Sequence, residues 1–150
     1  MQRSILLGLV SAVMLLVVAA GGYWWMKQNR PDQQWVPMPL NPSSTQEDRA
    51  RLQQQIQDYL SKEALLKKIV TELALSKRWN ANGDQQAYDR LKISFFVRLG
   101  EVRHPMTQEV MPTIDVGVKG KRKENRILAE IATRMARETR SYLGIEASME

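Results

Sequence analysis

Thr113-Ile114-Asp115-Val116-Gly117-Val118-Lys119 decides the fold class, because polar and apolar side chains alternate along it without error. A period of two predicts a β-strand with one buried and one solvated face. Asp115 is therefore expected on the solvated face, and Gly120 is expected to end the strand. The polar turn 121–125 then leads to an apolar stripe typical of a helix ending near Gly144: Ile127, Leu128, Ile131 and Met135.

The residues before this strand predict helices and one more strand. Ser44-Thr45-Gln46-Glu47 has the S-x-x-E form of a capping box, which predicts a helix start. We expect a break near Ser61, because Glu63 would otherwise face the core, and a further helix after the capping residue Asp84. A second strand alternates from Ile93 to Arg103. The first helical stripe consists of Leu52, Ile56, Tyr59, Leu66, Ile69, Val70 and Leu73. The pattern predicts one α+β domain over residues 45–150, with helices packed on a small antiparallel sheet.

Residues 29–44 form a proline-rich connector between this domain and the N-terminal segment. Its four prolines fix φ and remove backbone donors, which excludes a long helix or a central strand. The apolar part, Trp35 to Leu40, fits either an edge strand on the domain or a segment lying along a membrane surface.

The N-terminal segment has the features of a transmembrane helix. Ile5 to Trp25 contains no charged side chain and is long enough to cross a bilayer core, so residues 1–28 are interpreted as a membrane anchor. Tyr23, Trp24 and Trp25 end this run, where aromatic side chains favour the membrane interface, and Lys27 follows them. The sequence therefore predicts a single-pass protein in contact with membrane lipid.

A cleaved secretory signal is the alternative, with Val18-Ala19-Ala20 as the small residues before the cut. We favour the uncleaved anchor because the apolar run continues past Ala20 into the aromatic residues. The flanking charges are nearly balanced, Arg3 and the α-amine against Lys27 and Arg30, so orientation depends partly on the resemblance described below.

Composition and motifs exclude several kinds of catalysis. The chain has no cysteine, and His104 is its only histidine, so no Cys-based metal site or redox centre is expected. Phosphate-binding loops, dinucleotide-binding fingerprints and nucleophile elbows are absent from the sequence. Asp115, Glu101 and Glu109 are near one another in sequence, but nothing in their spacing singles out a catalytic pair. We therefore expect no enzyme activity, cofactor or metal.

A basic turn is the sharpest local feature of the domain, within a chain whose net charge is +6. Its residues form a candidate anion-binding site for a phosphate, a lipid headgroup or an acidic sugar, although a solvated corner is the alternative. No nucleic acid is expected, because Trp79, Tyr88, Phe95 and Phe96 fall at core positions and offer no stacking platform. The candidate residues are Lys119, Lys121, Arg122, Lys123 and Arg126.

Ser61 to Trp79, SKEALLKKIVTELALSKRW, resembles the helix that opens the membrane-proximal domain of Wzz-type polysaccharide chain-length determinants, the co-polymerases. Ala87 to Leu91, the strand from Thr113 to Val118 and the helix around Ile127 to Ala132 are similar in kind and order to the rest of that domain. The resemblance covers about Trp35 to Leu143. It implies a bacterial inner-membrane protein with a periplasmic C-terminal domain, which oligomerises and influences glycan length without being an enzyme.

Two departures from the family shape the expected function. Family members carry a long helical hairpin and a second membrane helix, and this sequence has neither before Glu150, so a minimal or split version is expected. Its basic turn, Lys121 to Lys123, is also more basic than the turn the family usually has, which bears on control of glycan length. We expect a membrane-anchored scaffold in surface glycan synthesis or export that assembles with itself or with a partner membrane protein. The alternatives are a pilus or secretion scaffold, or an anchored module that binds an anionic ligand through Lys119 to Arg126.

Overall fold

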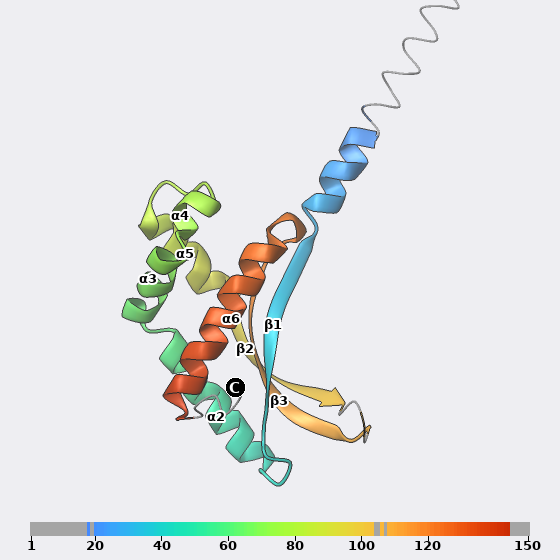
Figure 1. Cartoon of the computed structure of the whole chain (residues 1–150), viewed down its shortest axis with the longest axis vertical. Coiled ribbons are helices and arrows are strands. Elements are labelled where there is room, and N and C mark those ends of the chain that lie inside the picture. The colour runs from blue at the N-terminus through green and yellow to red at the C-terminus, as the bar shows by residue number, and fades with distance from the viewer. Residues whose placement is uncertain (1–17, 19, 104–105, 107, 145–150) are drawn as a thin grey trace, which may run out of the picture.

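The computed structural model describes residues 18, 20–103, 106 and 108–144. It confirms an α+β fold, in which a three-stranded antiparallel sheet is packed by helices. The strands lead away from a helical segment at residues 20–28, shown in blue in Figure 1. The elements that follow are β1 (Pro31–Pro39), α2 (Gln46–Leu60), α3 (Glu63–Glu72), α4 (Leu75–Arg78), α5 (Asp84–Ser94), β2 (Phe95–Arg103), β3 (Val110–Lys121), the 3₁₀ turn η1 (Arg122–Glu124) and α6 (Asn125–Tyr142).

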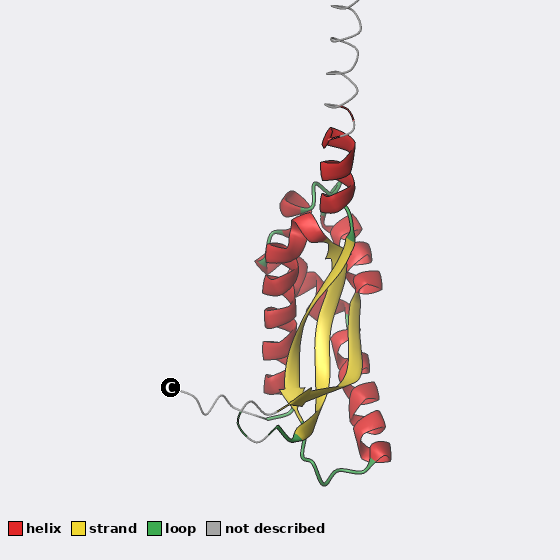
Figure 2. Cartoon of the chain, turned by 90° about the vertical axis from the view of Figure 1, so that its right-hand side faces the viewer, coloured by secondary structure: helices red, strands yellow, loops and turns green. Residues whose placement is uncertain are grey.

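The sheet has two different faces, with β3 between β1 and β2. Ile114, Val116 and Val118 of β3 are fully buried and belong to the hydrophobic core formed with the helices. The alternate positions of the strands point to the opposite face, where Trp35 and Phe96 lie on either side of Gly117. In Figure 2 the strands are in front and the helices lie behind them, so this second face has no helical cover among the described residues.

The apolar stripes predicted for the helices form the core. Ile56, Leu66 and Ile69 are fully buried, as are Leu128, Ile131 and Met135 of α6. The predicted break near Ser61 is confirmed, since α2 ends at Leu60 and α3 begins at Glu63. This break places Glu63 on the surface, where its carboxylate lies 2.6 Å from Lys67 Nζ.

Several predicted boundaries are wrong by a few residues. Thr45, not Ser44, caps α2, because its hydroxyl accepts from the Asp48 N–H at 3.1 Å. Gly83 occupies the N-cap of α5, where Asp84 was expected. The second strand begins at Phe95, and Ile93 is 84% exposed on the last turn of α5. A second break in the first helical region separates α3 from α4. Gly120 does not end the third strand as predicted, because β3 continues to Lys121.

β1 settles the placement of the connector's apolar part, which forms an edge strand against β3. The Leu40 N–H donates to Pro112 O at 2.8 Å, and the Arg122 N–H donates to Arg30 O at 3.0 Å. The backbone N–H and C=O groups of the even-numbered residues of β1 therefore point toward β3. Backbone groups alternate in direction along a strand, so the N–H and C=O groups of the odd-numbered residues point away from the sheet at its open edge. The outward positions include three prolines, which lack an N–H: Pro31, Pro37 and Pro39.

The prediction that Asp115 lies on a solvated face is wrong, because this carboxylate is only 6% exposed. Its register partner on β2 is Arg98, whose Nε lies 3.2 Å from Asp115 Oδ2, and the Thr113 hydroxyl donates to Oδ1 at 3.1 Å. The Arg98 guanidinium lies 4.9 Å from the Trp35 ring and 5.1 Å from the Phe96 ring. Side chains of the neighbouring strands thus cover the carboxylate where no helix does.

Of the four aromatic side chains predicted at core positions, Trp79, Tyr88 and Phe95 are buried, whereas Phe96 is half-buried beside Arg98.

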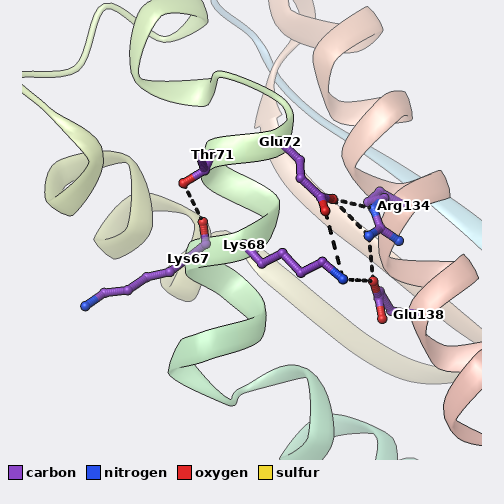
Figure 3. Close-up of polar contacts among 6 residues, drawn as sticks. All are labelled: Lys67, Lys68, Thr71, Glu72, Arg134 and Glu138. Carbon is purple, nitrogen blue, oxygen red and sulfur yellow. Dashed lines mark hydrogen bonds and ion pairs between the residues drawn. The ribbon is translucent and has the colours of Figure 1, made fainter.

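A charged network joins α3 to α6 (Figure 3). Arg134 on α6 donates to Glu72 on α3 at 2.9 Å, and its Nη2 also lies 2.6 Å from Glu138 Oε1. Lys68 on α3 contacts Glu138 at 3.4 Å, so each helix contributes one cation and one anion. The side chains of Arg134 and Glu138 are 18% and 13% exposed, which shields their attraction from solvent. The network therefore stabilises the packing of the two helices.

Candidate membrane-proximal site

The helical segment 20–28 passes into the sheet with almost no intervening chain. Its last turn is closed by Asn29, whose backbone N–H and side-chain amide both donate to Trp25 O, at 3.1 and 3.0 Å. Arg30 follows, and β1 begins at Pro31. Backbone hydrogen bonds are therefore present on both sides of the junction, within the last turn of the helix and between Arg30 and Arg122.

Large apolar side chains are exposed along this segment. Tyr23, Trp24 and Trp25 are 63%, 65% and 68% exposed, and Met26 beside them is 64% exposed. Consecutive residues of a helix lie about 100° apart, so these side chains surround the segment, and tryptophan and tyrosine favour the membrane–water interface. The assignment of these three aromatic residues to a membrane interface stays a prediction. Most of the proposed anchor, Ile5 to Trp25, lies outside the described residues.

The predicted basic turn lies beside this aromatic segment. Trp24, Lys27 and Gln28 of the helix line a cavity of about 410 Å³ together with Arg122 and Lys123 of η1. The register of β1 against β3 brings them together, because it pairs Pro31 at the start of β1 with Lys121 at the end of β3. Two features predicted separately, almost a hundred residues apart in sequence, therefore form one site, which we call the junction site.

The five predicted anion-binding residues do not act as one group. Arg122 and Lys123 line the junction site. Lys119 lies on the uncovered sheet face, with Nζ 5.7 Å from the centre of the Phe96 ring. Arg126 is 93% exposed on α6 and is 3.6 Å from Glu130. Lys121 is exposed at the N-cap of η1 and does not line the junction site.

Two acidic side chains near the basic turn, Glu124 of η1 and Asp32 of β1, are hydrogen-bonded to residues that do not line the junction site. Burial alone would raise the pKa of Glu124, but hydrogen bonds from Arg90 at 2.7 Å and from the Lys121 N–H at 3.2 Å outweigh it, and the pKa lies below its ordinary value. A hydrogen bond from Asn125 lowers the pKa of Asp32, helped by the Gln33 N–H and by the positive charge of Arg122. Both groups are ionised at neutral pH and offset part of the basic charge.

Sequence reasoning missed Lys27 and Gln28 as partners of the basic turn. Lys27 lies three residues after Trp24, so the two share one side of the helix. That spacing was a usable signal, but the approach of residues 122 and 123 depends on strand register, which no local pattern contains. The arrangement can bind an anion, because two flexible ammonium groups and one guanidinium border a common cavity.

The remaining chemical candidates give no second site. His104 lies outside the described residues. Asp115 is bound to Arg98 and Thr113, and the described residues contain no cluster of three or more side chains able to hold a metal ion. No helix within the described ranges is both long enough and apolar enough to cross a bilayer. Comparison with protein-family models, curated proteins and solved structures gives no match.

Proposed function

We propose that this chain is a single-pass, non-enzymatic assembly protein of the bacterial inner membrane, acting in surface glycan synthesis or export. Its α+β domain stands in the periplasm and assembles with copies of itself or with a partner membrane protein. The observation that carries the proposal is the junction: a helix with exposed Tyr23, Trp24 and Trp25 enters β1 directly, and the basic turn lies beside it. Aromatic and basic side chains at one level are typical of a membrane–water interface.

The continuity of helix and sheet supports a scaffold role. A protein that positions partners at a membrane surface benefits from a short connection between its anchor and its domain. Here the strand that follows the helix is hydrogen-bonded to the centre of the sheet along its whole length, from Pro31 to Pro39. The glycan part of the proposal comes from the resemblance of Ser61 to Trp79 and the segments after it to chain-length determinants.

An exposed apolar region at the far end of the domain supports assembly with a protein. The β2–β3 hairpin carries Leu99 and Val102, each 38% exposed, and Val110, which is 54% exposed. Figure 1 shows this hairpin extending beyond the helices. Exposed aliphatic side chains grouped at one end of a small domain are typical of a protein contact.

The first experiment tests the membrane part of the proposal. The full chain is expressed with a C-terminal reporter active only in the periplasm and, separately, with one active only in the cytoplasm. We expect carbonate-resistant membrane association and activity of the periplasmic reporter alone. A mature product in the soluble fraction, trimmed just beyond Ala20, rejects the anchor, and an active cytoplasmic reporter rejects the glycan role.

A second experiment tests the assembly part. Affinity capture of the full chain from detergent-solubilised membranes is expected to recover copies of the chain together with a glycan polymerase or flippase. Recovery of pilus or secretion subunits instead would overturn the assignment to glycan synthesis. Deleting the protein is expected to change the length distribution of surface glycan, and an unchanged distribution would count against the proposal.

A further inference from the structure

We infer that the junction site binds the phosphate headgroup of an anionic phospholipid and so holds the domain against the membrane surface. The inference rests on the proposed function, since it requires the anchor to lie in a bilayer. It adds a ligand class and a named set of residues: Lys27, Arg122 and Lys123, with Trp24 as the apolar wall of the cavity.

The charge of the cavity selects an anion. All the ionisable side chains that line it are basic, and they come from two segments that the β1–β3 register holds together. Glu124 is hydrogen-bonded to Arg90 and Asp32 to Asn125, and although the Asp32 carboxylate also attracts Arg122, the three basic side chains leave the site with a net positive charge. A phosphate is the suitable anion, because a guanidinium can bind two of its oxygens at once while each ammonium adds a mobile positive charge.

The position and the wall of the cavity select a lipid over free phosphate. Trp24, which is 65% exposed, lines the cavity and belongs to the aromatic group assigned to the membrane interface. An indole ring favours the level of the glycerol and headgroups, and free phosphate gains nothing from it. Basic side chains beside an anionic leaflet each strengthen membrane association about fivefold.

The helix that follows the basic turn, α6, provides a matched control. Arg137 and Arg140 are exposed on α6, and Figure 1 shows this helix running away from the junction. At 1.5 Å per residue, Arg137 lies about 20 Å from Lys123 along the helix axis. This distance exceeds two Debye lengths at physiological salt, so the charge of Arg137 is screened from the junction site. Arg137→Ala with Arg140→Ala therefore removes the same charge without touching the junction site.

The experiment uses the full chain reconstituted in phosphatidylcholine vesicles with or without phosphatidylglycerol. Lipids brominated near the glycerol end of the acyl chains quench nearby tryptophan fluorescence, and every variant carries Trp25→Phe so that Trp24 reports which lipid occupies the site. The relative quenching by brominated phosphatidylglycerol and brominated phosphatidylcholine gives the preference for anionic lipid. We expect Arg122→Ala with Lys123→Ala to lower this preference about five- to twenty-fold. The control pair should change it less than about twofold.

Three further outcomes decide the inference. The charge-conserving pair Arg122→Lys with Lys123→Arg should retain most of the preference, and its loss there would overturn a headgroup site in favour of a structural role. Inorganic phosphate should leave the preference unchanged relative to sodium chloride of equal ionic strength; abolition of the preference would show that the site takes the free ion. A chain that stays in the membrane without any preference for anionic lipid rejects the headgroup site alone, whereas a chain that does not insert rejects the proposed function.

Discussion

Replacing Arg134 by alanine should weaken the packing of α3 against α6 by about 2 kcal/mol. Arg134 donates to Glu72 at 2.9 Å and lies 2.6 Å from Glu138, and burial, which lowers the pKa of an arginine, is outweighed by these partners, so its pKa is raised. Its side chain is 18% exposed, so its ion pairs are intermediate between surface and buried pairs. Surface pairs contribute at most about 1 kcal/mol, and breaking a buried pair costs about 3–5 kcal/mol. Lys68 remains beside both carboxylates and limits the loss.

Thermal unfolding of the full chain in detergent micelles, followed by far-ultraviolet circular dichroism, measures this effect. A loss of about 2 kcal/mol corresponds to a decrease in Tm of about 10 °C for a domain of this size. A double-mutant cycle with Glu72→Gln should give a coupling free energy of about 1 kcal/mol between the two side chains. Arg137→Ala is the control, because this exposed residue on the same helix should change stability by less than about 0.5 kcal/mol. A coupling below about 0.3 kcal/mol, or equal effects of the two arginine substitutions, would refute the reasoning.

Three further predictions concern the sheet and the turn. Gly117→Ala should destabilise the domain by about 3 kcal/mol or more in the same assay, because its Cβ would lie 2.5 Å from the backbone oxygen of Gln34; Gly21→Ala, with nothing within 4 Å, should leave stability unchanged or slightly raised. Asp115→Asn should cost about 1–3 kcal/mol by removing the charge opposite Arg98, and an unchanged Tm would contradict the role given to this pair. The pKa of Glu124 is lower in the folded state than its ordinary value of 4.5, so the stability it contributes is present above pH 4.5 and is lost as the pH falls through the folded-state pKa. Glu124→Gln should therefore reduce the decrease in Tm between about pH 5 and pH 3, and an identical pH profile would disprove this.

The helices and the central strand could be predicted because their signals are local. Leu66 and Ile69 recur at helical spacing, and Ile114 alternates with Asp115, so the buried side of each element follows from sequence alone. The error at Asp115 has a different origin. Alternation correctly places this residue on the face opposite the core, but its burial depends on Arg98 of the neighbouring strand, and no local pattern reports which residues face each other across a sheet.

The junction site was predictable in its parts and not as a whole. The charge of Arg122 and Lys123 and the aromatic character of Trp24 stand out in the sequence. Their meeting follows from the pairing of β1 with β3, which in turn required the proline-rich segment to be an edge strand. The sequence left that placement open, because the prolines are compatible both with an edge strand on the domain and with a segment lying along a membrane surface.

Those same prolines set a limit on how copies of this protein can join. At the β1 margin Pro31, Pro37 and Pro39 have no N–H and the Gln33 N–H donates to Asp32 Oδ1, so an incoming backbone finds too few donors for a continuous ladder. The β2 margin has no proline between Leu99 and Arg103. Backbone pairing can therefore extend the sheet more readily at β2 than at β1, and a pair joined through two β2 margins would leave only β1 margins outside, which limits further growth.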